Sequence, residues 1–437
     1  MTTPTIHVGI IQHAPYIRFT LHGTFRTASG RTLSGTHRAA FAEGALTLDG
    51  ETCTRLAFTP ADETASFTLE QVTIGHSFHW QRQEDQTFTG SLTIIPDTDG
   101  LTAINDIDVE SYLTSVISSE MRATSAPEFL KAHAVISRSW LLAQIGRRRG
   151  AQTQAARPDF RLTDDEHIRW HDREDHDLFD VCADDHCQRY QGITRAMNPA
   201  AAQAISETRG QVLADRRGHV CDARFSKCCG GASEHFAACW DDRDPDYLSP
   251  VRDCPPPTLL PDLTREDEAR RWMTSAPEAF CHTDDPAILS QILNDYDRET
   301  TPDFYRWTVR YTQAELSRLL RERTGTNFGA ILDLTPLERG ASGRIVRLRV
   351  VGERRSLTIG KELEIRRALS PTHLFSSAFV VDRGEGTPPQ EFTLHGAGWG
   401  HGVGLCQIGA AVMGARGYSY RDILAHYYRN TQLLTLY

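Results

Sequence analysis

Along the first hundred residues, apolar and polar side chains alternate in short runs separated by turn-forming residues. The runs Tyr16-Ile17-Arg18-Phe19-Thr20-Leu21 and Ser91-Leu92-Thr93-Ile94-Ile95 are examples. A period of two places successive side chains on opposite faces of a strand. We therefore expect an antiparallel β domain over residues 1–101. Because this domain carries no cluster of reactive side chains, we interpret it as a scaffold or targeting module.

The pattern changes to a helical period over roughly Thr102 to Arg149. Asp108 is placed to cap a first helix, and Glu120 lies on that helix's apolar stripe, which comprises Val109, Tyr112, Leu113, Val116 and Ile117. A second helix is predicted to begin at a capping box from Ser125 to Glu128 and to run to Ile145. The segment predicts a helical hairpin with a carboxylate on its apolar side.

The rest of the chain mixes helical and strand patterns. The proline-rich run that begins at Cys254 predicts a loop or linker near residues 254–262. Beyond it we predict a helix over Tyr311 to Arg323, strands over Ile345 to Val351 and Phe375 to Val381, and a last helix with a capping box of Ser419 and Asp422. The expected fold class is α+β, with an N-terminal β domain (1–101) and a larger mixed domain (102–437) whose cleft is lined by the helical hairpin and a glycine-rich loop.

Composition and charge exclude several classes of protein. Of the 437 residues, 40% are apolar and 24% are charged, which is typical of a globular chain. The net charge is −10, and lysines and arginines form no long basic stripe, so we expect no nucleic-acid partner. No apolar run reaches the length of about 18 residues that a membrane span requires, so we predict no transmembrane segment. Residues 1–10 lack the pattern of a secretory signal.

Glu120 is the first candidate for chemistry. A carboxylate on the buried side of a helix loses hydration, which raises its pKa toward the range of a general acid. Lys131 and Arg138 share one face of the second helix, at i and i+7, where they could face Glu120 and either hold a sugar hydroxyl or acyl oxygen or tune the acid. The alternative for Glu120 is a side chain that faces solvent. The alternative for Lys131 and Arg138 is a solvated helix face with ordinary ion pairs.

A second constellation lies within twelve residues and contains His176, Cys182, His186 and Cys187. An imidazole and two thiolates suit zinc, which favours nitrogen and sulfur ligands. The spacing is not that of a zinc finger. Free or disulfide-bonded cysteines remain the alternative.

A third motif interleaves glycines with polar residues from His395 to Gly409 and includes Trp399, His401 and Gln407. Closely spaced glycines let the backbone approach a ligand and free its N–H groups as donors. A phosphate loop is unsupported because the motif lacks a Lys followed by Ser or Thr. A purely structural turn remains the alternative.

Further cysteines gather later in the chain, at positions 221, 228, 229, 239, 254 and 281. Six cysteines allow fifteen pairings, so the pattern is compatible with disulfides or with buried thiols. Cys53 and Cys406 are interpreted as small core residues. A competing nucleophile is Ser226 or one of the cysteines in the segment from Lys227 to Gly231. The sequence shows no clear Cys, His and Asn in the order expected of a catalytic triad.

Taken together, these segments resemble the SpoIID/LytB family of bacterial cell-wall proteins over about Ile104 to Tyr437. The motifs occur in the family's order: YLTSVISSEM from Tyr112, LKAHAVISRSW from Leu130, HCQRYQG from His186, CGGASE from Cys229, GWGHGVGLCQIGA from Gly398 and HYY from His426. Two positions depart from the family pattern. Ser137-Arg-Ser-Trp140 stands where Ala-Arg-Thr-Tyr is usual, and Cys406 stands where the family has Ser.

The resemblance implies a peptidoglycan lytic transglycosylase that cleaves between N-acetylmuramic acid and N-acetylglucosamine and leaves a 1,6-anhydro end. It assigns Glu120 as acid and then base, and it implies zinc at His176, Cys182 and Cys187 with His186 in reserve. We add Lys131, Arg138, His395, Trp399, His401 and Gln407 as candidates for substrate placement. The implied partners are glycan strands in the cell envelope, including strands stripped of stem peptides.

Two rival functions stay open at this point. One is a non-catalytic peptidoglycan-binding protein that enhances a cell-wall amidase, as some family members do. The other is a zinc hydrolase that acts on stem peptides.

Overall fold

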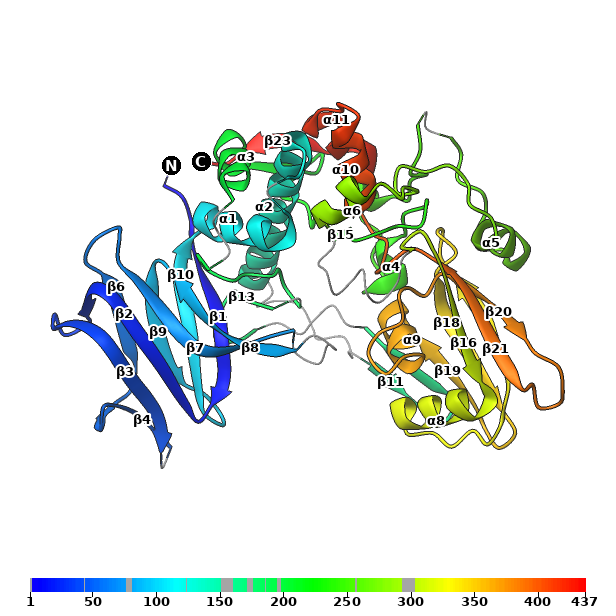
Figure 1. The fold of residues 1–437 in the computed structure, drawn as a ribbon, viewed down its shortest axis with the longest axis horizontal. Helices are drawn as coiled ribbons and strands as arrows, with labels where there is room; N and C mark the ends of the chain where they lie inside the picture. Colours follow the sequence, from blue (N-terminus) through cyan, green and yellow to red (C-terminus); the bar gives the residue numbers. More distant parts are fainter. Residues whose placement is uncertain are drawn as a thin grey trace.

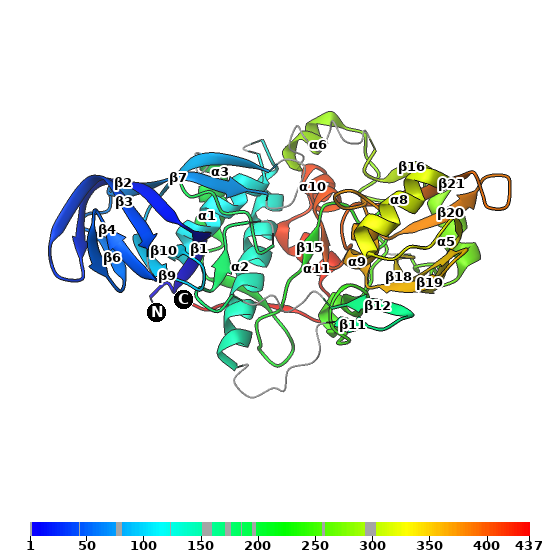
Figure 2. The same cartoon turned by 90° about the horizontal axis from the view of Figure 1, so that it is seen from below.

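The structure, a computed structural model, describes the chain except for residues 1, 43, 76–80, 123, 151–159, 171–175, 185, 195–197, 256–257 and 293–302, and the side chains of 148–150. Figure 1 shows three parts in a row: an N-terminal β lobe, a helical centre and a second lobe with sheets and helices. Figure 2, turned by 90°, shows the same order, and the two chain ends lie side by side in both views. The predicted α+β class is confirmed.

The N-terminal lobe is an eleven-stranded sheet with the order β13-β1-β10-β9-β6-β2-β3-β4-β5, in which β7 pairs with β2 and β8. Its strands are β1 (Thr5–Ala14), β2 (Tyr16–Thr27), β3 (Thr32–Ala42), β4 (Ala45–Leu48), β5 (Glu51–Cys53), β6 (Leu56–Pro60), β7 (Ser66–Ile74), β8 (Arg82–Phe88), β9 (Ser91–Pro96), β10 (Leu101–Asp108) and β13 (Val181–Cys182). All neighbours are antiparallel except β13, which pairs parallel to β1. The expected antiparallel architecture is present, with one strand added from the segment after the hairpin.

The helical centre packs on this sheet. It contains α1 (Val109–Glu120), α2 (Pro127–Gly150), α3 (Pro199–Glu207), α6 (Pro286–Ile292), α10 (Gln407–Ala415) and α11 (Tyr420–Tyr427), with the strand pairs β14 (Gln211–Ala214) with β23 (Gln432–Thr435) and β15 (Phe225–Ser226) with β22 (Leu405–Cys406). One hydrophobic core joins sheet and helices, so that Phe88 of the sheet packs on Tyr190 and Tyr190 on Tyr112. The core is therefore continuous across the predicted boundary after residue 101.

The second lobe has its own hydrophobic core around Leu320, Leu348 and Phe392. A five-stranded sheet has the order β11-β12-β19-β18-β17 and a three-stranded sheet the order β16-β21-β20. The elements are β11 (Phe160–Leu162), β12 (Glu166–Arg169), α5 (Glu266–Met273), β16 (Arg306–Thr312), α8 (Gln313–Thr324), β17 (Ile331–Arg339), β18 (Ile345–Gly352), β19 (Ser356–Gly360), α9 (Glu362–Ala368), β20 (Phe379–Arg383) and β21 (Glu391–Ala397). The short helix α4 (Phe236–Cys239) and a 3₁₀ turn (Asp246–Leu248) bury their apolar residues in the first core instead.

Most local predictions hold. Asp108 caps α1, and the capping box of Ser419 and Asp422 is present at α11. The Ser125 capping box is wrong: α2 begins at Pro127, so Ser125 stands too early to cap it, and its buried hydroxyl makes no hydrogen bond. The strand predicted from Phe375 begins only at Phe379.

Two further expectations concern longer segments. Residues 256–257 of the predicted linker lie outside the described residues. Among the helices that the structure describes, none combines the length and apolarity needed to cross a bilayer.

Candidate catalytic carboxylate and cysteine clusters

Helix α1 carries Glu120 to its C-terminal end. The Asp108 side chain accepts hydrogen bonds from the backbone N–H groups of Glu110 and Ser111, which starts the helix at Val109. The predicted apolar stripe is buried as expected. Glu120 is the last helical residue and is half-buried, because the chain turns to an extended conformation at Met121. The carboxylate thus stands where a helix meets the surface.

The segment after α2 folds back onto α1. Cys182 lies in β13 at the edge of the N-terminal sheet, opposite Gly9 of β1. The backbone N–H of Gln191 donates to Ser115 Oγ at 3.2 Å, and the hydroxyl of Tyr112 donates to Gln188 Oε1 at 3.4 Å. These bonds fix residues 188–191 against the same helix that carries Glu120.

This segment brings His176, Cys182, His186 and Cys187 together, and we call them the His176 cluster. Their four ligand atoms lie within 4.8 Å of one another. Cys187 Sγ is 3.4 Å from His176 Nε2 and 3.5 Å from His186 Nδ1, and Cys182 Sγ is 3.9 Å from His186 Nδ1. Tetrahedral zinc, with bonds of about 2.3 Å to sulfur and 2.0 Å to nitrogen, spaces such atoms about 3.5 Å apart. The geometry is that of a group able to hold a metal ion.

The electrostatics of the His176 cluster favour a thiolate. A hydrogen bond from Cys187, together with the imidazoles of His176 and His186, holds the pKa of the Cys182 thiol well below its usual value, although burial opposes this shift. The pKa of Cys187 is raised by its hydrogen bond with Cys182 and by burial. Cys182 is therefore the thiol of the pair that loses its proton more readily, and the thiolate is the form that binds a cation.

Tyr112 links the His176 cluster to Glu120. Burial raises the pKa of the Tyr112 phenol well above its usual range, and the nearby thiols of Cys187 and Cys182 and the carboxylate of Glu120 raise it further. The Tyr112 phenol therefore interacts electrostatically with both the cluster thiols and the Glu120 carboxylate.

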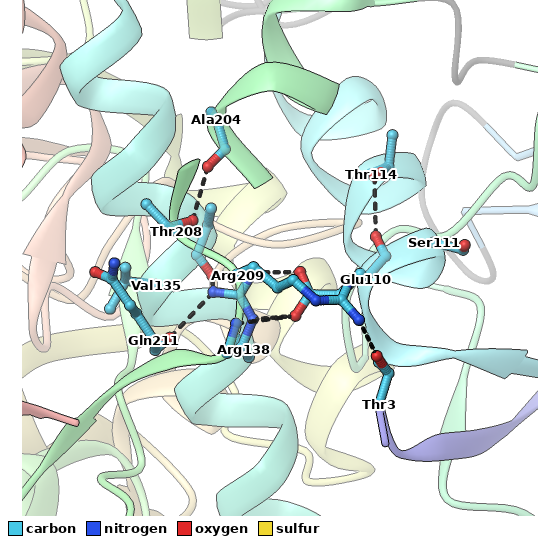
Figure 3. A network of polar contacts seen from close by, with 12 residues as sticks. Thr3, Glu110, Ser111, Thr114, Val135, Arg138, Ala204, Thr208, Arg209 and Gln211 are labelled. Atoms are coloured by element: carbon cyan, nitrogen blue, oxygen red, sulfur yellow. Dashed lines mark hydrogen bonds and ion pairs between the residues drawn. The ribbon is translucent and has the colours of Figure 1, made fainter. Parts of the chain in front are cut away.

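Lys131 and Arg138, predicted to face Glu120, have other partners. Lys131 Nζ lies 2.8 Å from Glu128 Oε1 and 2.7 Å from Glu207 Oε2. Arg138 is completely buried and forms a two-pronged ion pair with Glu110, at 2.9 and 2.6 Å, in the network of Figure 3. Arg138 also donates to the backbone oxygen of Gln211. Arg138 therefore joins α1, α2 and β14 and has no exposed surface to offer a sugar.

The glycine-rich loop is packed against the protein itself. A β-carbon at Gly402 would collide with the guanidinium of Arg344, and one at Gly404 would collide with the backbone oxygen of Arg224. Both glycines also have positive φ angles, of 76° and 72°. The alternative of a structural turn therefore accounts for these two positions.

The polar residues of the loop are distributed over several contacts. His395, in β21, lies 3.2 Å from Asp382 Oδ2, and Trp399 stacks between Phe304 and Phe375. His401 packs on Trp240, and its pKa is lowered by burial and then by Arg224, Arg344 and Arg366. Gln407 Nε2 lies 3.2 Å from His133 Nε2 on α2. His395 and Trp399 keep partly exposed side chains, whereas Gln407 is buried.

A second group of side chains able to hold a metal ion was not predicted from the sequence. Cys229, Asp253, Cys281 and Cys406 are all buried, and their ligand atoms lie within 4.8 Å of one another. We call them the Cys229 cluster. Cys406 is buried as expected but belongs to this group, whereas Cys53 is only half-buried. The signal that could have found it is Cys406 itself, a cysteine where the family has serine.

All ten cysteines are free, which settles the choice between disulfides and thiols in favour of thiols in this structure. The second lobe also holds a cavity of about 380 Å³, lined by Trp170, Asp242 and Lys361 among others. None of the predicted site residues is among its described lining. The cavity is therefore separate from the Glu120 site.

Comparison with known proteins agrees with these motifs. Residues 97–214 match the sequence model of the stage II sporulation protein family, SpoIID, and residues 234–404 match a domain of unknown function (DUF8618). Stage II sporulation protein D of Bacillus subtilis is 24% identical over 333 residues, which are 76% of each chain. The same protein of Bacillus amyloliquefaciens is 24% identical over 334 residues, 76% of this chain and 75% of its own.

An amidase enhancer of Bacillus subtilis is 25% identical over 252 residues, which are 54% of this chain but only 33% of that protein. The family match covers α1, α2 and the His176 cluster, so both Glu120 and the four cluster residues lie inside it. Residues 97–214 therefore match the SpoIID family, and the chain as a whole is similar to stage II sporulation protein D and, over about half of its length, to the amidase enhancer.

Proposed function

We propose that the protein is a peptidoglycan lytic transglycosylase with Glu120 as its acid and base. Protonated Glu120 gives its proton to the glycosidic oxygen as the bond from C1 of N-acetylmuramic acid breaks. The C6 hydroxyl oxygen of the same sugar then bonds to C1, and its proton returns to Glu120. No water is consumed, the product carries a 1,6-anhydro ring, and one carboxyl group is enough.

The position of Glu120 carries the proposal. It ends a buried helix while remaining half-exposed, so a glycan could reach it. The Tyr112 phenol, on the same helix, interacts electrostatically with Glu120 and with the thiols of the His176 cluster. A carboxyl group held by a rigid helix beside a fixed polar cluster suits proton transfer, because general acid–base catalysis needs the group positioned at the reacting atoms.

The donor set of the His176 cluster fits zinc. Two imidazoles and two thiolates complete a tetrahedron without water, whereas His176, Cys182 and Cys187 alone would leave one position open. Zinc would supply positive charge beside Tyr112 and Glu120. The ligands' own contribution is to hold His176, Cys182, His186 and Cys187 together next to the residues that contact α1, and we propose this role for all four.

Among the candidates for sugar contact, we retain His395 and Trp399, because both keep partly exposed side chains, whereas the partly exposed His401 packs its ring on Trp240. The substrate would be glycan strands in the cell envelope, as the resemblance implies, and strands stripped of stem peptides are included.

Mass spectrometry of products tests the proposal. The native protein and Glu120→Gln would each be incubated with intact and with amidase-stripped glycan strands. We expect 1,6-anhydromuramic ends from the native protein and a loss of about 10²–10⁴-fold in rate for Glu120→Gln. The matched control is Glu322→Gln, an exposed glutamate of α8 that pairs only with Arg318 in the described contacts. Absence of sugar products from the native protein on both substrates would refute it.

A second candidate is favoured by the amidase-enhancer relative. Here the protein would bind glycan strands without cutting them and accelerate a separate cell-wall amidase. A rise in the amidase rate that survives Glu120→Gln, with no anhydro product, would support this role.

A further inference from the structure

The Cys229 cluster joins four segments that are far apart in the sequence. Cys229 follows β15, Cys406 ends β22 and precedes α10, and Asp253 and Cys281 come from the loops on either side of α5. All four lie outside residues 97–214, the SpoIID match. Their side chains are exposed by 2%, 0%, 1% and 0% for Cys229, Asp253, Cys281 and Cys406.

The distances fit a tetrahedral metal ion. Cys229 Sγ lies 3.6 Å from Cys281 Sγ and 3.4 Å from Asp253 Oδ2. Two thiolates on a tetrahedral zinc ion stand about 3.8 Å apart, and a thiolate and a carboxylate oxygen about 3.6 Å apart, for bonds of about 2.3 and 2.1 Å. A disulfide would instead bring two sulfurs to about 2.05 Å. The spacing is that of ligands around a shared ion.

Asp253 is oriented like a metal ligand. Its Oδ1 accepts a hydrogen bond from the Tyr427 hydroxyl at 2.7 Å and lies 3.5 Å from His426 Nε2. Its Oδ2 accepts from the backbone N–H of Cys281 at 3.1 Å and faces the Cys229 thiol. Ligating carboxylates are held in this way by outer hydrogen bonds, which leave one oxygen directed at the ion.

Burial makes a cation favourable here. A carboxylate without exposed surface is costly to bury unless a positive charge or several donors compensate it. The three thiols are weak donors, and each becomes a strong ligand once deprotonated. The Cys228 thiol also contacts those of Cys281 and Cys406, so a further sulfur stands beside the group.

We propose that Cys229, Cys281, Cys406 and Asp253 bind one Zn²⁺ in a closed, structural site. Binding releases the three thiol protons and fills all four positions, so no water is left to activate. The ion links the turn after β15 to the start of α10, and so fixes the end of the glycine-rich loop. The site is additional to the His176 cluster and does not depend on the proposed cleavage of glycans.

Metal analysis of the purified full chain tests the site. With both clusters filled we expect two zinc equivalents per chain. Cys281→Ser and Cys406→Ser should each lose one equivalent, and Cys187→Ser, in the His176 cluster, should lose the other. Cys239→Ser is the control, because Cys239 is a buried free thiol outside both clusters. Zinc content unchanged in both Cys281→Ser and Cys406→Ser would overturn the proposal.

A second measurement covers variants that fail to fold. In Cys182→Ser with Cys187→Ser, the Cys229 cluster keeps all its ligands, so Co²⁺ loaded into this chain should give the intense visible bands of a tetrahedral thiolate site. Peptide mapping without reductant should find Cys229, Cys281 and Cys406 as free thiols. Absence of those bands, or a disulfide among these cysteines in the native protein, would overturn the proposal.

Discussion

The His176 cluster and the Cys229 cluster use similar ligands in opposite surroundings. In the first, His186 is exposed, His176 and Cys187 are half-buried, and only Cys182 is buried. In the second, every ligand is buried and the neighbours are Tyr427 and His426. The ligand types alone would not distinguish the two groups. Access to solvent does, because the first cluster has ligands at the surface and the second has none.

A hydrogen bond joins the helical hairpin to the start of α10. His133 of α2 accepts from Gln407, which follows Cys406 at the start of α10, and its other ring nitrogen lies 3.1 Å from Ser137 Oγ. The hairpin that carries Glu120 is therefore connected to the buried cluster through a neutral histidine.

The largest expected difference is in metal release. A chelator in excess should remove zinc from the His176 cluster about 10³-fold faster, or more, than from the Cys229 cluster, because reaching a core site requires an opening that costs roughly 5 kcal/mol or more. A colorimetric zinc assay would record the two phases, and Cys187→Ser should lack the fast one. Equal release rates for both ions would remove the distinction between the clusters.

Arg138→Met tests the helical hairpin beneath the His176 cluster. It leaves the buried Glu110 carboxylate without its partner, so we expect a loss of about 3–5 kcal/mol in the free energy of unfolding. Urea unfolding monitored by circular dichroism measures it. Arg318→Met, at an exposed ion pair of α8, is the control and should change stability by less than about 1 kcal/mol. Similar losses in both variants would show that the buried Glu110–Arg138 pair contributes no more to stability than an exposed ion pair.

Tyr427→Phe tests the Cys229 cluster alone. Loss of the hydroxyl that orients Asp253 should lower zinc affinity there by about 10–100-fold and leave the His176 cluster unchanged, because outer hydrogen bonds tune ligating groups. Competition with a chelator of known affinity measures both. Tyr428→Phe removes a neighbouring buried hydroxyl that donates to Arg224 instead, and it should keep full affinity. An unchanged affinity in Tyr427→Phe would argue against Asp253 as a ligand.

The smallest effect concerns the junction between the two regions. Burial lowers the pKa of His133 from 6.5 to about 3, so the folded chain keeps it neutral while the unfolded chain protonates it below about pH 6.5. Above pH 6.5 this difference in protonation costs no stability. As pH falls toward 3, protonation of His133 in the unfolded chain lowers the free energy of unfolding, by about 2 kcal/mol at pH 5.

His133→Gln removes this titration, so its stability should fall less between pH 7 and pH 5 than that of the native protein. Urea unfolding at the two pH values compares them. An identical fall in both proteins would place the acid sensitivity elsewhere.

Local signals in the sequence were enough for much of the fold and for the first cluster. The caps at Asp108 and Ser419 were predictable because a cap acts within three residues of its partner. The strands of the N-terminal lobe followed from their period of two. The His176 cluster was predictable because its ligands lie within twelve residues, and such short spacing limits where the chain can place them.

Only the tertiary structure decided the partners of residues far apart in the chain. Arg138 lies on the predicted helix face, but its pairing with Glu110 depends on how α1 packs against α2. Cys229 and Cys406 are 177 residues apart, and two separate loops bring Asp253 and Cys281 to them. The sequence by itself determined where each helix and strand could form and which nearby side chains share a site, because these depend on short-range geometry. The depth of burial that separates one cluster from the other arises only when distant segments pack together.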